Sequence, residues 1–144
     1  MQSANCYDQN IRHLIKANYQ RMIAFEQAAF ISDNASLKSF YTARADESEN
    51  NLKQLYSCLN MSEAKGESYA AHNNGNTSYY FSHLFTGKKT SIKLLESAKT
   101  LEKTILEWYK TAIKEIKSLP KKIVEVVSNQ YGKLSDAQLQ LQYL

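Results

Sequence analysis

The sequence has little of the two residues that interrupt helices. One proline and four glycines occur in 144 residues. Proline removes a helical hydrogen bond, and glycine costs about 1 kcal/mol relative to alanine inside a helix. Long stretches of the chain are therefore compatible with helix, and 144 residues suffice for one domain with its own core.

Cysteines and long apolar runs are also scarce. Cys6 and Cys58 lack the spacing of a metal or redox motif, so two reduced thiols are expected. No run approaches the ~18 consecutive apolar residues of a membrane span. The first residues, MQSANCYDQNIRHL, lack the apolar centre of a signal peptide. We therefore expect a cytoplasmic protein with no membrane partner.

Several catalytic motifs are missing. The chain has no glycine-rich phosphate loop, no G-x-S-x-G and no Cys/His pair suited to nucleophilic catalysis. These absences argue against hydrolase and nucleotide-binding functions and favour a protein that is not an enzyme.

Helical periodicity is present in four long segments, for which we predict helices at about 8–31, 35–59, 89–119 and 121–141. Asn34 or Ser36 is placed to cap the second, and Pro120 suits the start of the fourth. Residues 60–88 are polar, with a loop signal at 72–76. Within them, the amphipathic stretch Ser78–Phe85 predicts a short helix.

The connection lengths predict how these helices are arranged. Only a few residues join the first two helices, so these should be antiparallel neighbours. The segment 60–88 is long enough to travel the ~37 Å length of a 25-residue helix. We therefore predict one all-α domain over 1–144, a four-helix bundle of two hairpins running up-down-down-up with a long crossover.

Four stretches carry a resemblance to a known family: IKANYQRMIAFEQAA (15–29), SLKSFYTARADES (36–48), YYFSHLFTG (79–87) and LEKTILEWYKTAI (101–113). With these apolar-and-carboxylate patterns, residues 10–144 resemble the bacterial ferritin-like four-helix family of unknown function that is associated with stress-response loci. The resemblance implies a ferritin-like fold, self-association and no established activity.

A di-iron centre of the ferritin-like kind requires inward carboxylates and two Glu-x-x-His pairs, which place both ligands on one helical face. None of His13, His72 and His83 has a glutamate three residues before it. His13 falls on the outward face of its helix, and the other two lie in the crossover. We therefore expect no cofactor, with a residual iron or manganese site at Glu26, Glu47 and Glu102 as the alternative.

Inward carboxylates nevertheless need partners. The apolar stripe of the first helix is predicted as Ile11, Leu14, Ile15, Tyr19, Met22, Phe25, Ala29 and Phe30. At 100° per residue, Glu26 falls inside this stripe and Glu102 inside that of the third helix, while Glu47 lies at a margin. The up-down-down-up layout brings Glu26 and Glu102 to one height. We predict a buried polar layer of Glu26, Tyr41, Arg44, Glu102 and Gln138, in which Arg44 bridges the two glutamates.

Positive charge is concentrated in the third helix. Residues 88–122 carry ten lysines against four glutamates, whereas residues 1–87 are nearly balanced. One ~60° arc of the helix holds a lysine ridge, away from the apolar stripe. The ridge comprises Lys99, Lys103, Lys110, Lys114 and Lys117. The simpler interpretation is a solvated face on which Glu107 pairs with neighbouring lysines. The functional alternative is a surface that binds an anionic partner.

Aromatic residues gather in the crossover, at Tyr79, Tyr80, Phe81 and Phe85. They indicate either a dimer surface or small-ligand cleft, or a lid on one end of the core. The C-terminal QLQLQYL predicts an amphipathic end that packs on a second subunit.

Three functions remain open. The first is a non-catalytic bundle acting through self-association, with a homodimer as first expectation, or through protein interaction; the resemblance adds a stress-related role. The second is a divergent iron- or manganese-binding oxidoreductase or iron-handling protein. The third is anion or nucleic-acid binding through the lysine ridge, which has no arginine cluster or nucleic-acid motif to support it.

Overall fold

All regular secondary structure that the computed structural model describes, over residues 2–73, 90–116 and 120–144, is helical. The helices there are α1 (Gln2–Ile31), α2 (Ala35–Cys58), α3 (Glu63–Asn73), α4 (Ser91–Glu115) and α5 (Lys121–Gln142). The predicted all-α class is therefore confirmed. None of these helices has a stretch both long and apolar enough to cross a membrane.

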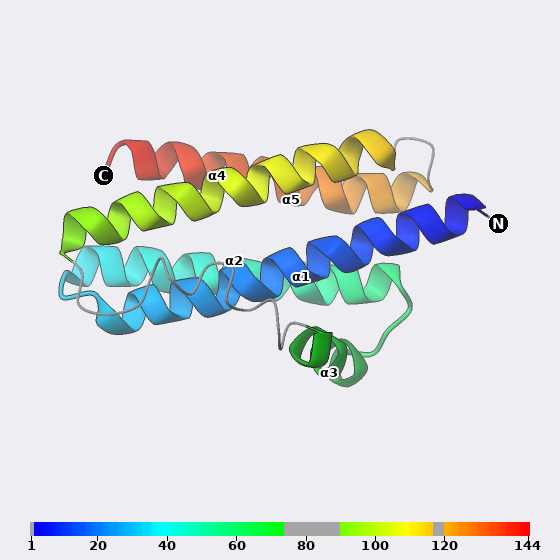
Figure 1. Ribbon diagram of the computed structural model, residues 1–144, viewed down its shortest axis with the longest axis horizontal. Helices are drawn as coiled ribbons and strands as arrows, with labels where there is room; N and C mark the ends of the chain where they lie inside the picture. The colour runs from blue at the N-terminus through cyan, green and yellow to red at the C-terminus, as the bar shows by residue number, and fades with distance from the viewer. Residues whose placement is uncertain (1, 74–89, 117–119) are drawn as a thin grey trace.

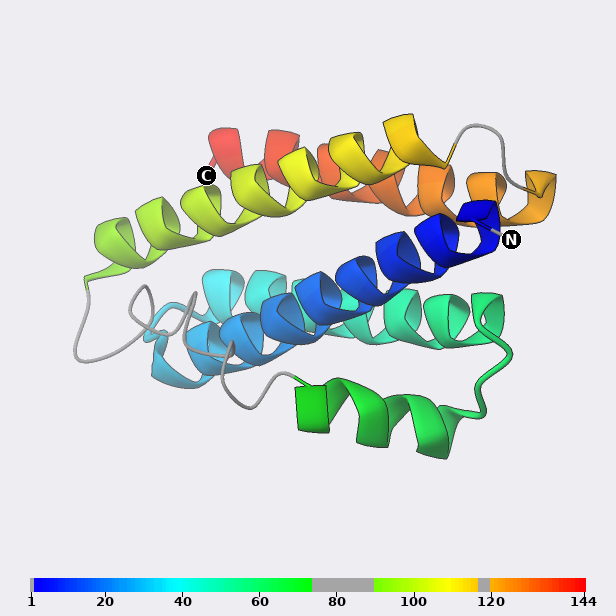
Figure 2. The same cartoon turned by 45° about the vertical axis from the view of Figure 1, so that its right-hand side comes forward.

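The four long helices lie side by side (Figure 1). α1 and α5 run in one direction, and α2 and α4 run in the other. α1 packs against α2 and α4, while α5 packs against α4 and less extensively against α2. The α1–α2 hairpin therefore faces the α4–α5 hairpin, and the apolar core lies between them (Figure 2).

Local hydrogen bonds determine where α2 begins and ends. The Asn34 side chain accepts from the Leu37 N–H at 2.9 Å, which satisfies a free donor of the first turn. At the other end, Asn60 adopts a left-handed φ of 58°. The Met61 N–H then reaches back to the Tyr56 carbonyl at 2.9 Å, the pattern of a Schellman cap.

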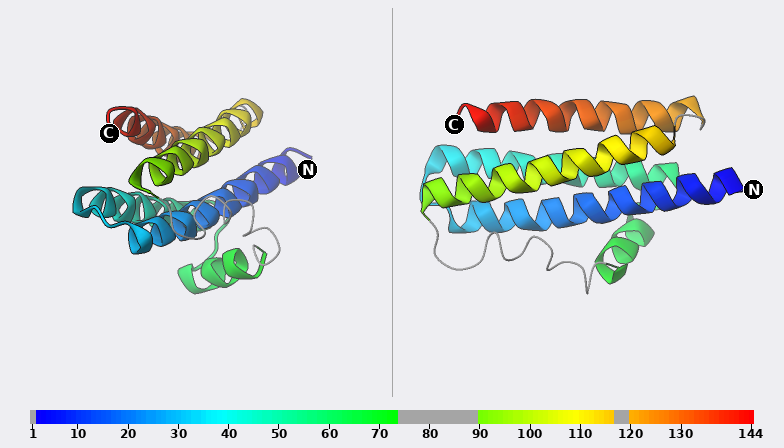
Figure 3. Two further views of the ribbon diagram at one scale, coloured as in Figure 1. Left: turned by 60° about the vertical axis from the view of Figure 1, so that its left-hand side comes forward. Right: turned by 45° about the horizontal axis from the view of Figure 1, so that its top comes forward.

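The helix α3 (Glu63–Asn73) is not predicted, because residues 60–77 are interpreted as polar loop before a short helix at Ser78–Phe85. It lies on the outer face of the α1–α2 hairpin, away from α4 and α5 (Figure 3). Gly66 permits this packing, because a Cβ atom at that position would lie 2.3 Å from the Tyr56 ring. The Arg12 guanidinium of α1, 4.7 Å from the Tyr69 ring centroid, adds a second contact to α3.

Other boundaries differ from the prediction by several residues. α1 begins at Gln2 rather than at residue 8, and α4 spans Ser91–Glu115 rather than 89–119. The predicted short helix Ser78–Phe85 and its aromatic residues lie outside the described residues. Gly132 does not interrupt α5; it is exposed, and a Cβ atom at this position would have no neighbour within 4 Å in the described part of the chain.

Candidate functional site

The centre of the bundle contains a charged residue, Arg21 of α1, whose side chain is fully buried. Its Nε and Nη2 donate to Glu102 of α4 at 2.6 and 2.8 Å, a bidentate pair. Nη2 also donates to Glu47 of α2 at 3.0 Å. Nη1 donates to the Ser48 hydroxyl at 2.9 Å and to the Arg44 carbonyl at 3.2 Å. All five N–H donors of the guanidinium are therefore bonded.

The charges of this centre nearly balance. Glu102 is 1% exposed, and Glu47 stands nearer the surface with 17% of its side chain exposed. The second Glu47 oxygen lies 3.9 Å from Nη2 of Arg44, so two cations face two carboxylates. Burial alone would lower the pKa of Arg21, but the charges and hydrogen bonds of Glu102 and Glu47 outweigh it and raise that pKa.

A chain of polar side chains continues from the arginine to α5. The Ser48 hydroxyl donates to Asn18 Oδ1, and Asn18 Nδ2 donates to the Tyr109 hydroxyl at 2.7 Å. Tyr109 in turn donates to Gln130 Oε1 at 2.6 Å. Gln130 Nε2 completes the chain on α2, with the Asn51 carbonyl at 3.1 Å. The network thus joins α1, α2, α4 and α5.

The predicted bridge by Arg44 is wrong. Arg44 contacts neither Glu26 nor Glu102; its guanidinium lies 4.7 Å from the Phe40 ring centroid and donates to Gln140 of α5 at 3.2 Å. Arg44 therefore lies at the rim of the centre, where only its backbone carbonyl contacts Arg21. One arginine does lie between two glutamates, but it is Arg21 in place of Arg44 and Glu47 in place of Glu26, while Glu102 is common to both arrangements.

The other members of the predicted polar layer divide between core and surface. Glu26 is exposed, which contradicts its predicted inward position. Gln138 is half-buried. Tyr41 is fully buried beside Phe25, with ring centroids 5.9 Å apart, and its hydroxyl has no hydrogen-bond partner among the described residues. Burial raises the pKa of Tyr41 to about 12.

The sequence does contain a signal for Arg21. The core positions of α1 repeat at intervals of three and four residues, through Leu14, Asn18, Arg21, Phe25 and Ala28. Two polar residues occupy this buried line, and the predicted stripe instead includes Tyr19 and Met22, which are only partly buried. That shift of one residue rotates Glu26 inward and Arg21 outward. It also places Phe30 in the core, whereas the structure leaves it 84% exposed.

The carboxylates of the centre do not suit a metal ion. Iron and manganese sites in such bundles use several carboxylates with histidines. Here Glu102 gives both oxygens to Arg21, and Glu47 gives one. Over the described part of the chain, no group of three or more His, Cys, Asp and Glu side chains is placed to hold a metal. The Arg21 guanidinium lies between the two carboxylates and supplies the positive charge that they face.

The histidines and the ridge lysines that the structure describes lie at the surface. His13 is exposed, with its ring centroid 5.2 Å from that of Trp108, and His72 is exposed on α3. His83 and Lys117 lie outside the described residues. Lys99, Lys103, Lys110 and Lys114 are exposed on α4. The predicted pairing of Glu107 with its neighbouring lysines is not present within 4 Å among the described side chains.

Comparison of the chain with protein-family models, with curated proteins and with solved structures found no match.

We predict that Glu102→Gln lowers the free energy of unfolding by about 3–5 kcal/mol, because Arg21 loses its bidentate partner while remaining buried. The matched control is Glu96→Gln, at an exposed position of the same helix, where a change within about 0.5 kcal/mol is expected. Guanidinium chloride denaturation measures both. Equal, small effects of the two substitutions would contradict a desolvated ion pair at Glu102.

A second pair of variants tests the hydrogen-bond network with one chemical change. Tyr109→Phe should destabilise the protein by about 1–3 kcal/mol, because Asn18 and Gln130 both lose a buried partner. Tyr41→Phe removes a buried hydroxyl that has no partner among the described residues, and it should leave stability unchanged or raise it by about 1 kcal/mol. Denaturation curves that show equal losses for both variants would contradict the network.

Proposed function

We propose that this chain is a ferritin-like four-helix bundle in which a buried arginine stands where related bundles hold metal, and that it acts without catalysis, by self-association. The directions of α1, α2, α4 and α5, with a long connection between the second and third of these, support the ferritin-like layout. The family resemblance of residues 10–144 supports the same proposal, and a stress-related role stays a prediction from that resemblance.

The interior supports a structural role. A buried hydrogen-bond network in which the donors of Arg21, Asn18 and Gln130 all have partners specifies one register of the helices, because any slip would strand several polar groups. The alternative of an iron- or manganese-dependent oxidoreductase has less support, since Arg21 already engages the inward carboxylates.

The distribution of exposed apolar side chains is the observation that carries self-association. Five of the six large hydrophobic residues exposed in the described chain belong to helix ends that meet at one end of the bundle (Figure 1). These five are Phe30 of α1, Ile92 of α4, and Leu139, Tyr143 and Leu144 at the C-terminal end of α5. Below, they are called the apolar end.

A second copy of the chain is the proposed partner of the apolar end. Phe30 and Tyr143 are 84% and 87% exposed, the highest fractions of the five, and hydrophobic side chains grouped on a surface are typical of interaction sites. Aromatic side chains are enriched at interfaces, and twofold homodimers are the commonest soluble oligomers. An end-to-end or side-by-side dimer through these residues would cover them.

We predict that the protein dimerises, and that the double variant Phe30→Ser, Tyr143→Ser raises the dimer dissociation constant by at least about tenfold. Ile23→Ser is the control for an exposed apolar side chain outside the apolar end, because Ile23 is 38% exposed and lies about two turns of α1 before Phe30. Sedimentation velocity over a range of concentrations measures the change. A monomeric wild type, or equal weakening by the control, would contradict the proposal.

A further inference from the structure

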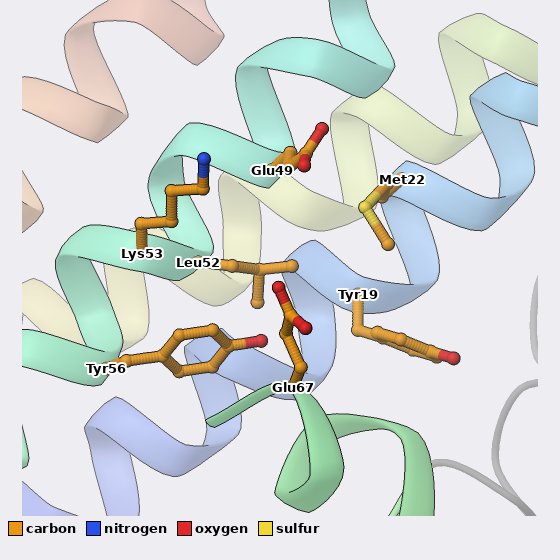
Figure 4. Close-up of a pocket in the computed structure, with 7 residues that line it drawn as sticks. All are labelled: Tyr19, Met22, Glu49, Leu52, Lys53, Tyr56 and Glu67. Atoms are coloured by element: carbon orange, nitrogen blue, oxygen red, sulfur yellow. The ribbon is translucent and has the colours of Figure 1, made fainter. Parts of the chain in front are cut away.

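A small pocket lies between α1, α2 and α3, outside the arginine centre. Its volume is about 110 Å³, enough for a few water molecules or one small organic ion. Its lining comprises Tyr19, Met22, Glu49, Leu52, Lys53, Tyr56 and Glu67 (Figure 4). Three helices therefore contribute to it, and α3 supplies Glu67 alone.

The part of the pocket nearest α3 is an aromatic and apolar space with one carboxylate in it. Figure 4 shows the Glu67 side chain reaching between the rings of Tyr56 and Tyr19, with Leu52 and the Met22 thioether on the side away from α3. The Lys53 ammonium group points away from the two tyrosines, and Glu49 lies beyond it. The charged groups of the lining sum to one negative charge.

The Glu67 carboxylate has no cation within ion-pair distance among the described residues. Its negative charge acts on the neighbouring ring: burial, the charge of Glu67 and Tyr19 together raise the pKa of Tyr56 to about 12. An exposed carboxylate that lies between two tyrosine rings (Figure 4), with no cation within 4 Å among the described residues, favours a positively charged ligand.

The fold holds these walls in place. Tyr56 is 2% exposed, and its ring packs against the backbone of Gly66, the residue that precedes Glu67. Ala70, one turn further along α3, is completely buried. Glu67 follows Gly66 and precedes Ala70 by about one turn, so it lies at the edge of the α3 face that packs on the bundle.

We propose that this pocket binds a small organic ammonium ion, such as the head of a methylated amine. The Tyr19 and Tyr56 rings in the lining would attract a cation, Glu67 would supply the opposite charge, and Leu52 with Met22 would contact the methyl groups. An inorganic cation would require several converging oxygen ligands, and no group of three or more His, Cys, Asp and Glu side chains among the described residues is placed to hold one. A neutral molecule of the same shape gains only the apolar contacts.

The probe is tetramethylammonium chloride, titrated into protein carrying ¹³C-labelled methionine methyl groups. The Met22 signal should shift and saturate with a dissociation constant of about 1–10 mM, while the Met61 signal, from outside the pocket, should not move. Potassium chloride at equal ionic strength should give no saturable shift. tert-Butyl alcohol, a neutral molecule of similar shape, should bind at least about tenfold more weakly.

Two glutamine substitutions on α3 distinguish an effect of the Glu67 carboxylate in the pocket from the loss of one negative charge elsewhere on the helix. Glu67→Gln should weaken tetramethylammonium binding about tenfold, whereas Glu63→Gln, on the same helix but outside the pocket, should change it less than about twofold. Both positions are exposed, so both variants should fold. No saturable Met22 shift up to about 100 mM, equal binding of the alcohol, or unchanged binding by Glu67→Gln would each overturn the proposal.

Discussion

The fold of this protein depends on how one buried guanidinium is satisfied. Moving an arginine and a carboxylate from water into a protein interior costs several kcal/mol for each ion. Arg21 recovers that cost only because α2 and α4 bring Glu47, Glu102, Ser48 and a main-chain carbonyl to its five N–H groups together. Each partner belongs to a helix, and it reaches Arg21 only if that helix has one position along the bundle axis and one rotation about its own axis. The Arg21–Glu102 ion pair therefore specifies how the helices are arranged more than it adds to the stability of the fold.

The polar chain that leaves the arginine extends this constraint to the rest of the bundle. Through Asn18 and Tyr109 the α1–α4 contact is tied to Gln130 of α5, which binds back to α2. The polar side chains of this network are bonded to one another, so the proposed binding sites lie at the surface. Those surfaces are distinct: the apolar end lies where helix termini meet, and the small pocket depends on α3, which packs on the outside of the α1–α2 hairpin.

Periodicity and connection length predict the helical class correctly. They do not predict which face of α1 is buried, because a shift of one residue turns the helix by about 100°. The line Leu14, Phe25 and Ala28 is apolar, but Asn18 and Arg21 complete it, and a rule that excludes polar residues from a core rotates the helix away from them. The spacing along α1 places Arg21 in this line, but the partners that stabilise its buried charge, Glu102 and Glu47, belong to other helices and are not visible in the periodicity of α1. α3 escapes prediction for a similar reason: Gly66 weakens its helical signal, and its packing on Tyr56 requires that glycine.

The most direct test of the proposal that the arginine centre leaves no site for a metal is elemental analysis of the purified protein after incubation with Fe(II), Mn(II) and Zn(II). Because Arg21 occupies both oxygens of Glu102 and one of Glu47, less than about 0.1 metal ion per chain should remain after desalting. One or two iron or manganese ions per chain, lost in the Glu102→Gln variant, would contradict a centre closed by arginine.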